Sequence, residues 1–154
     1  MVSQAIADAV NSPDWLDESH SDHDPNLMVV GYDTRFLSDR FAREVSRVLA
    51  ANGIKVYLAH ADAPTPAISY AVTYLRAAGA VMVTASHNAP RYNGIKLKAA
   101  YGGSALPAQC RRVEVYLNDN ETRARGPNLM DFDQGVHAGM ITRFNPFQPY
   151  AEHV

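Results

Sequence analysis

The sequence predicts an α/β fold, namely a three-layer domain with a mostly parallel mixed sheet flanked by helices. Three observations lead to this prediction. Short apolar runs at residues 27–32 and 80–84 have the length of buried strands, and residues 54–59 alternate between the two faces as a strand does. Segments with the apolar spacing of helices separate these runs, and such alternation favours parallel pairing with right-handed crossovers. A length of 154 residues is enough for one domain with its own hydrophobic core.

Start and stop signals bound the two helices between these strands. The first has Ser38 as its predicted N-cap and a stop signal at Gly53. The second has Thr65 as its predicted N-cap and Pro66 at its first helical position. We expect this second helix to end at Gly79, because glycine favours the conformation that terminates helices.

Weaker patterns flank these elements. Before them, we expect an amphipathic helix at residues 3–10 and a polar loop at residues 11–26. After them, we expect an edge strand at residues 95–99 and a further helix at residues 107–117. The pattern then dissolves, and the last residues, with two prolines and three aromatic side chains, are typical of a connector.

This pattern divides the chain into three parts. Residues 1–26 form an N-terminal helix and polar loop, residues 27–140 form the domain itself, and residues 141–154 form a linker.

Composition narrows the classes of partner and compartment. The net charge of −2 gives no electrostatic reason to expect nucleic acid or an anionic membrane as a partner. The N-terminus lacks the basic and apolar regions of a signal peptide. The one cysteine, Cys110, fits a reducing compartment, so we expect a cytoplasmic protein.

Three loops should meet at one edge of the sheet, because the carboxyl ends of parallel strands lie together and ligands bind there. They begin at Asp33, His60 and Thr84. The third contains hydroxyl, imidazole and amide side chains and is followed by Lys96. We therefore expect one composite site at this edge.

Ser86 is the residue in the third loop that we expect to carry a phosphoryl group. A phosphoserine has nearly two negative charges and three strong acceptor oxygens, so it needs donors and cations nearby. Lys96, Arg35 and His87 can supply them, and a divalent metal ion would add more charge.

Two other interpretations of this loop stay open from the residues alone. The stretch could be a well hydrogen-bonded turn with no chemistry. It could also be a hydrolase nucleophile, Ser86, with His87 as its base. Adjacent residues rarely orient in that way and no G-x-S-x-G segment is present, which disfavours the hydrolase.

The loop TASHNAPRYNGIK, residues 84–96, closely resembles the phosphoserine loop of the α-D-phosphohexomutase family, with its T-A-S-H-N-P followed by N-G-x-K. VVGYDTR at residues 29–35 and PTP at residues 64–66 resemble two further segments of that family's first domain. The family includes phosphoglucomutases, phosphomannomutases and phosphoglucosamine mutases. Ala89 departs from the pattern, since the family usually has proline there.

The resemblance implies domain I of a phosphohexomutase, which interconverts hexose 1-phosphate and hexose 6-phosphate through a phosphoserine. It implies Mg2+ as a cofactor, bound through the phosphate on Ser86, and glucose 1,6-bisphosphate as an activator. Ser86, His87 and Lys96 would be catalytic. The remaining implied residues shape the loop or support the phosphate, and they are Thr84, Asn88, Asn93, Gly94 and Arg35.

Several parts of the family's pattern have no counterpart here. The D-x-D-x-D metal loop, the G-E-x-S-G sugar loop, the R-x-S-G-T phosphate loop and the opening F-G-T-x-G-x-R strand are not found. We therefore expect an N-terminal fragment that begins inside domain I, is inactive or nearly so alone, and has the remaining domains and a hexose phosphate as partners. Self-association is a further expectation, and a non-catalytic sugar-phosphate or partner-binding module is the alternative.

Overall fold

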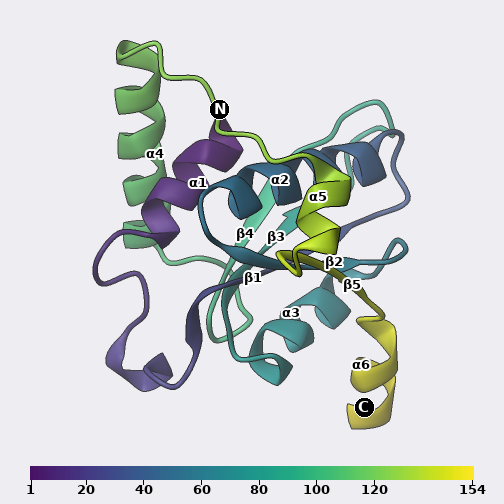
Figure 1. Cartoon of the computed structure of the whole chain (residues 1–154). Coiled ribbons are helices and arrows are strands. Elements are labelled where there is room, and N and C mark those ends of the chain that lie inside the picture. The colour runs from purple at the N-terminus through teal and green to yellow at the C-terminus, as the bar shows by residue number, and fades with distance from the viewer.

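The computed structural model describes residues 1–154 and contains one five-stranded sheet with helices on both faces (Figure 1). The strand order is β4-β3-β1-β2-β5, with β4 antiparallel to β3 and every other pair parallel. The strands are β1 (Asp24–Tyr32), β2 (Lys55–Ala59), β3 (Ala77–Val83), β4 (Ile95–Ala99) and β5 (Ile141–Phe144). The prediction of a mostly parallel mixed sheet is confirmed.

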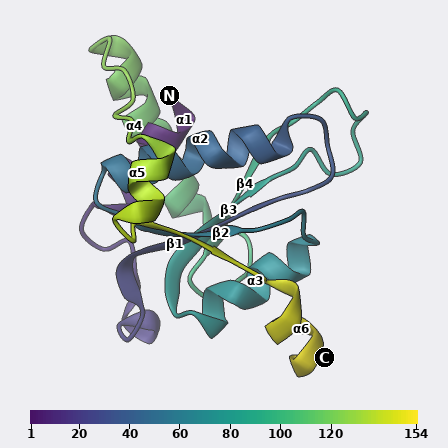
Figure 2. The same cartoon turned by 45° about the vertical axis from the view of Figure 1, so that its right-hand side comes forward.

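The helices divide between the two faces of the sheet. In Figures 1 and 2, α1, α2, α4 and α5 lie on one side of the sheet and α3 and α6 on the other, so the N- and C-termini lie on opposite sides. No helix is both long enough and apolar enough to span a membrane. The helices are α1 (Val2–Val10), the short 3-10 helix η1 (Glu18–His20), α2 (Ser38–Ala51), α3 (Thr65–Tyr74), α4 (Pro107–Thr122), α5 (Phe132–His137) and α6 (Phe147–His153).

Two hydrophobic cores, one on each face, explain the continuous apolar run of β3. Val81 and Val83 belong to the core beneath α1 and α2, whereas Ala80 and Met82 belong to the core beneath α3. Side chains alternate between the faces of a strand, so a strand covered on both faces is apolar at every position. All seven residues of β3 are buried.

The boundary between α3 and β3 differs from the prediction. The helix ends at Tyr74 rather than at Gly79, and Arg76 takes the left-handed conformation, φ 51°, that reverses the chain. Gly79 instead lies inside β3, where a Cβ atom would collide with the carbonyl oxygen of Lys98 on β4. A glycine at this position therefore allows β3 and β4 to approach closely, and it does not end the helix.

The prediction of a linker from residue 141 onward is wrong in its first residues. Ile141–Phe144 form β5, which pairs in parallel with β2 and contacts the preceding helix α5. Phe144 packs edge-on against Tyr57 of β2. Pairing with β2 satisfies backbone groups that a linker would leave to water. That residues 145–154 lead toward a second domain stays a prediction.

The polar loop before the first core strand is also shorter than expected. β1 begins at Asp24, whose backbone pairs with Ala77 of β3, although residues up to 26 were expected in the loop. His23 lies beside this pairing, with its Nδ1 2.7 Å from the carbonyl oxygen of Ala77.

Candidate functional site

Two loops lie side by side at the carboxyl edge of the sheet. One joins β1 to α2 at residues 33–37, and the other joins β3 to β4 at residues 84–94. Figure 2 shows both extending beyond the sheet in the same direction. At the base of the second loop, the amide of Thr84 donates to the carbonyl of Gly94 at 2.9 Å.

The carboxylate of Asp33 is the centre of the contacts between these loops. Its Oδ1 accepts from the backbone amide of Arg35 and from the hydroxyl of Ser38, each at 3.0 Å. Its Oδ2 accepts from Arg35 Nε at 3.1 Å and from the hydroxyl of Thr84 at 2.6 Å. Each carboxylate oxygen therefore has two donors.

The side chain of Arg35 crosses from the first loop to the second. Its Nη1 donates to the carbonyl of Ala89 at 2.9 Å and to that of Tyr92 at 3.3 Å, and its Nη2 donates to the carbonyl of Ser86. The side chain is only 11% exposed. All three guanidinium nitrogens thus bond to Asp33 or to backbone carbonyls of the β3–β4 loop.

Thr84 connects Asp33 to the backbone of Ser86. It is buried just after the end of β3, and its Oγ1 accepts from the amide of Ser86 at 3.1 Å while donating to Asp33. Ser86 has φ 56°, in the left-handed region that non-glycine residues seldom adopt. Both polar backbone groups of Ser86 are held, its amide by Thr84 and its carbonyl by Arg35.

The tip of the loop faces solvent. Ser86, His87 and Asn88 are exposed, and the amide of Asn88 closes a turn onto the carbonyl of Ala85. The serine hydroxyl makes no hydrogen bond within the chain, and neither His87 nor Lys96 bonds to it. An exposed hydroxyl on a held backbone is accessible to a substrate.

Lys96 lies on β4, next to the base of the loop. It is opposite Met82 in the antiparallel pairing with β3, so it projects from the face that α3 covers. Lys98 projects from the same face, and the pKa of its ammonium is lowered, first by burial and then by the charge of Lys96.

Asn93 and Gly94 shape the return of the loop toward β4. The amide nitrogen Nδ2 of Asn93 donates to the hydroxyl of Ser38 at 2.9 Å and to the carbonyl of Phe36 at 3.4 Å. Ser38 was predicted as the N-cap of α2, but Leu37 holds that position with φ 63°, and the Ser38 hydroxyl bonds to Asp33 instead. Ser38 therefore joins the site.

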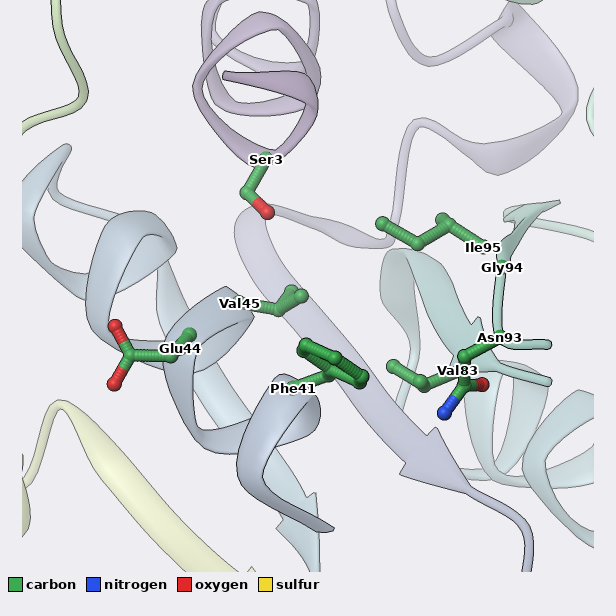
Figure 3. A pocket seen from close by; sticks show the side chains of 8 residues that line it. All are labelled: Ser3, Phe41, Glu44, Val45, Val83, Asn93, Gly94 and Ile95. Carbon is green, nitrogen blue, oxygen red and sulfur yellow. The ribbon is translucent and has the colours of Figure 1, made fainter. Parts of the chain in front are cut away.

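A cavity of about 290 Å³ lies behind the loop, between α1, α2 and the start of β4 (Figure 3). Phe41, Val45, Val83 and Ile95 give it apolar walls. Asn93 is one of the residues that line the cavity, and its Oδ1 atom is buried without a hydrogen-bond partner. An unpaired oxygen is unusual for a buried polar group.

The pKa of Asp33 reflects both its burial and its hydrogen bonds. Burial by itself raises the pKa of its carboxyl, but hydrogen bonds from Thr84, Arg35 and Ser38 outweigh burial. The net effect lowers the pKa below its ordinary value of 3.8, so Asp33 is ionised at neutral pH.

The chain contains no group of three or more His, Cys, Asp or Glu side chains that could hold a metal ion. Family enzymes use Mg2+, which prefers several oxygen ligands. The residues of this chain do not supply such a set, since Asp33 already has four donors and a phosphate on Ser86 would add only one ligand group.

The structure brings some of the predicted site residues together, but it does not bond His87, Lys96 or the second predicted loop to them. Arg35, Thr84, Ser86 and Asn93 belong to one hydrogen-bond network. The loop after β2 bonds to the end of β1, through the amide of Ala63, and not to the β3–β4 loop. Thr65, its predicted N-cap residue, is the first residue of α3 and Pro64 is the N-cap.

Sequence reasoning placed Asp33 in a site loop without giving it a role, and it missed Ser38 as a site residue. The position of Asp33, directly after a buried strand at the edge where ligands bind, was the signal for that loop. Ser38 had none, because its hydroxyl could equally have capped the helix.

Comparison with known proteins places this geometry in a family. Residues 4–124 match the model of the phosphoglucomutase/phosphomannomutase alpha/beta/alpha domain I. The phosphoglucomutase of Staphylococcus saprophyticus is 41% identical over 99 residues, which are 64% of this chain and 18% of that protein. The phosphoglucomutase of Staphylococcus epidermidis is 44% identical over 92 residues, which are 60% of this chain and 17% of that protein.

A solved structure agrees in fold. The crystal structure of a candidate phosphomannomutase of Thermus thermophilus matches with a TM-score of 0.72 and 32% identity, over 98% of this chain and 29% of that one. The chain thus spans less than a third of the proteins it matches. By its sequence, its sheet and its loop, the chain belongs to the phosphoglucomutase/phosphomannomutase family and contains that family's domain I.

Proposed function

We propose that this chain is the phosphoserine-bearing first domain of a phosphohexomutase, with Ser86 as the residue that accepts and returns the phosphoryl group. The observation that carries the proposal is the geometry of Ser86. Its amide and carbonyl are held by Thr84 and Arg35, while its hydroxyl is exposed and unbonded. Phosphoryl transfer depends mainly on positioning, which a held backbone provides.

The proposed reaction has two transfers. In the first, the bond between phosphorus and Ser86 Oγ breaks, a bond forms to a hydroxyl of the hexose monophosphate, the hydroxyl proton passes to a base, and Ser86 Oγ receives a proton. In the second, the bond between the other phosphorus of the hexose bisphosphate and its sugar oxygen breaks, a bond forms to Ser86 Oγ, the serine proton passes to a base, and the sugar oxygen receives a proton. The net result moves phosphate between O1 and O6 of the sugar, and the serine ends phosphorylated as it began.

His87 and Lys96 are the proposed acid–base and charge-bearing groups. His87 is exposed beside Ser86, and Lys96 lies at the base of the loop on β4. Arg35 is a weaker candidate for the phosphate, because its three nitrogens already have acceptors. We propose that Arg35 braces the loop.

The isolated chain should show no mutase turnover, or almost none. It spans 18% of a full-length relative and lacks a carboxylate cluster for Mg2+. The proposed partners are therefore the remaining phosphohexomutase domains and a hexose phosphate, with glucose 1,6-bisphosphate as the phosphoryl donor.

The test is intact-mass spectrometry after incubation with glucose 1,6-bisphosphate and Mg2+. We expect one added phosphate on the wild type and on Ser19→Ala, which removes another exposed serine. We expect none on Ser86→Ala. If the wild type takes up no phosphate even when the remaining domains of a relative are added in trans, Ser86 is not the phosphoryl acceptor.

A non-catalytic module that binds a sugar phosphate is the second candidate. It is favoured by one observation, namely that neither His87 nor Lys96 bonds to Ser86. Saturable binding of glucose 6-phosphate by calorimetry, without covalent phosphate in any mixture, would support this module over the mutase domain.

A further inference from the structure

The contacts of Asp33 leave it with no capacity for a ligand of its own. Four donors surround its carboxylate, two on each oxygen, and three of these come from Arg35 and Ser38 in its own loop and helix. The fourth is the hydroxyl of Thr84, which reaches across from β3 at 2.6 Å. Asp33 therefore acts on other residues and not on a substrate.

Two separate routes lead from Asp33 to the backbone of Ser86. The first runs through Thr84, whose hydroxyl donates to Asp33 and accepts from the Ser86 amide. The second runs through Arg35, whose Nε bonds to Asp33 and whose Nη2 bonds to the Ser86 carbonyl. We infer that Asp33 is the positioning residue of the phosphoryl-transfer site and that it holds Ser86 in its left-handed conformation by these two routes. This inference rests on the proposed function only in taking Ser86 as the phosphoryl acceptor.

The chemistry of both routes requires a carboxylate. An acceptor-only group fixes the Thr84 hydroxyl as a donor, which turns its lone pairs toward the Ser86 amide. It also gives Arg35 Nε a charged acceptor that sets the plane of the guanidinium, from which Nη1 and Nη2 reach the loop. An asparagine has one acceptor oxygen, and its amide nitrogen would face the donors of Thr84 and Arg35.

A left-handed serine needs such support from its surroundings. A non-glycine residue in this region is strained by about 1–2 kcal/mol relative to its preferred conformations. Without restraints on both sides, the Ser86 peptide groups would relax and the hydroxyl would move relative to Lys96. Strained residues persist where the structure around them fixes them, and they cluster at functional sites.

The experiment measures hydrogen exchange by NMR in the full chain, at the Ser86 amide and at Arg35 Nε–H. Thr84→Val removes the first route and should speed exchange of the Ser86 amide by about three- to tenfold, the range expected for one hydrogen bond. Thr84→Ser keeps the hydroxyl and should restore exchange to within about twofold of the wild type. Asp33→Asn should speed exchange at both groups.

The matched control is Asp131→Asn. Asp131 is the N-cap of α5 and also accepts from a backbone amide, that of Gln134 at 2.9 Å, but lies outside the network. It should leave exchange at Ser86 and Arg35 unchanged. Amides of β1 and β3 report folding in every variant.

The double variant decides between coupled and independent roles. If Asp33 acts through Thr84, Thr84→Val should add little to the effect of Asp33→Asn on the Ser86 amide. Additive effects, or an unchanged Ser86 amide in Asp33→Asn with an intact core, would overturn the inference. Because exchange needs no phosphoryl transfer, a chain that takes up no phosphate even with the remaining domains added in trans would contradict the proposed function without changing the exchange result.

Discussion

Substitution of Ile141 tests the most unexpected element of the fold, the edge strand β5. Its side chain is 1% exposed and belongs to the core beneath α2, and its Cα lies opposite Val56 of β2. Ile141→Ala removes about three methyl or methylene groups at about 0.8 kcal/mol each, or about 2.4 kcal/mol of transfer free energy. The cavity left behind brings the expected loss to about 3–4 kcal/mol.

Urea unfolding followed by circular dichroism would measure this loss. Ile141→Val should cost about 0.5–1.5 kcal/mol, which keeps a graded variant folded if the alanine variant is too unstable to study. Thr142→Ala, on the next and exposed position of the same strand, should change stability by less than about 0.5 kcal/mol. A loss below about 1 kcal/mol for Ile141→Ala would mean that residues 141–144 are not part of the sheet, as a linker would require.

Three further predictions concern the site and its scaffold. Because the pKa of Asp33 lies below 3.8 in the folded state, its stabilising effect is full above about pH 4 and is lost as pH falls further. The difference in stability between wild type and Asp33→Asn, measured by urea unfolding from about pH 6 to about pH 2.5, should shrink on acidification. A constant difference would contradict this. Gly79→Ala should cost more than about 2 kcal/mol, because the new methyl group meets the carbonyl of Lys98 and forces β4 away, and thermal unfolding would show it. Trp15→Phe should cost about 1–3 kcal/mol in the same assay, since it removes the indole donor to the buried carbonyl of Ala78.

The central strands were predictable from their burial. β1, β2 and β3 lie inside the sheet; the buried positions of β1 and β3 are consecutive and produce apolar runs, whereas β2 has an exposed Lys55 and a half-buried Tyr57 and shows alternation instead. β5 has four residues, of which Thr142 and Arg143 are exposed, so no comparable run exists. An edge strand of this length is defined by its pairing with β2, which arises only in the folded chain.

The glycines gave the least reliable boundary signals. Gly53 has φ 78° just after α2 and ends that helix as the sequence indicated. Gly79 is also a glycine but does not end a helix, since its missing side chain makes room for the backbone of Lys98 on β4. The chain reverses at Arg76, whose positive φ no propensity would have predicted.

The loop of the site was predictable from its motif, and the network that holds it was not. The motif identified residues 84–96 as a unit because they are contiguous. Asp33 is 51 residues from Thr84 in the chain, and their hydrogen bond exists because β1 and β3 are neighbours in the sheet. Strand order, which the periodicity does not give, decides which loops touch.

The way Arg35 holds the loop also bears on Ala89, the position where the family usually has proline. Arg35 bonds to the carbonyls of Ser86, Ala89 and Tyr92, and every residue type has a carbonyl. Alanine in place of proline therefore leaves these hydrogen bonds of Arg35 intact and changes only the conformational entropy of the unfolded chain, by about 0.4–1 kcal/mol. Hydrogen bonds to main-chain atoms tolerate changes of loop sequence, provided that Asp33 keeps the guanidinium in place. The restraint on Ser86 thus depends more on residues outside the loop than on the identity of residue 89 within it.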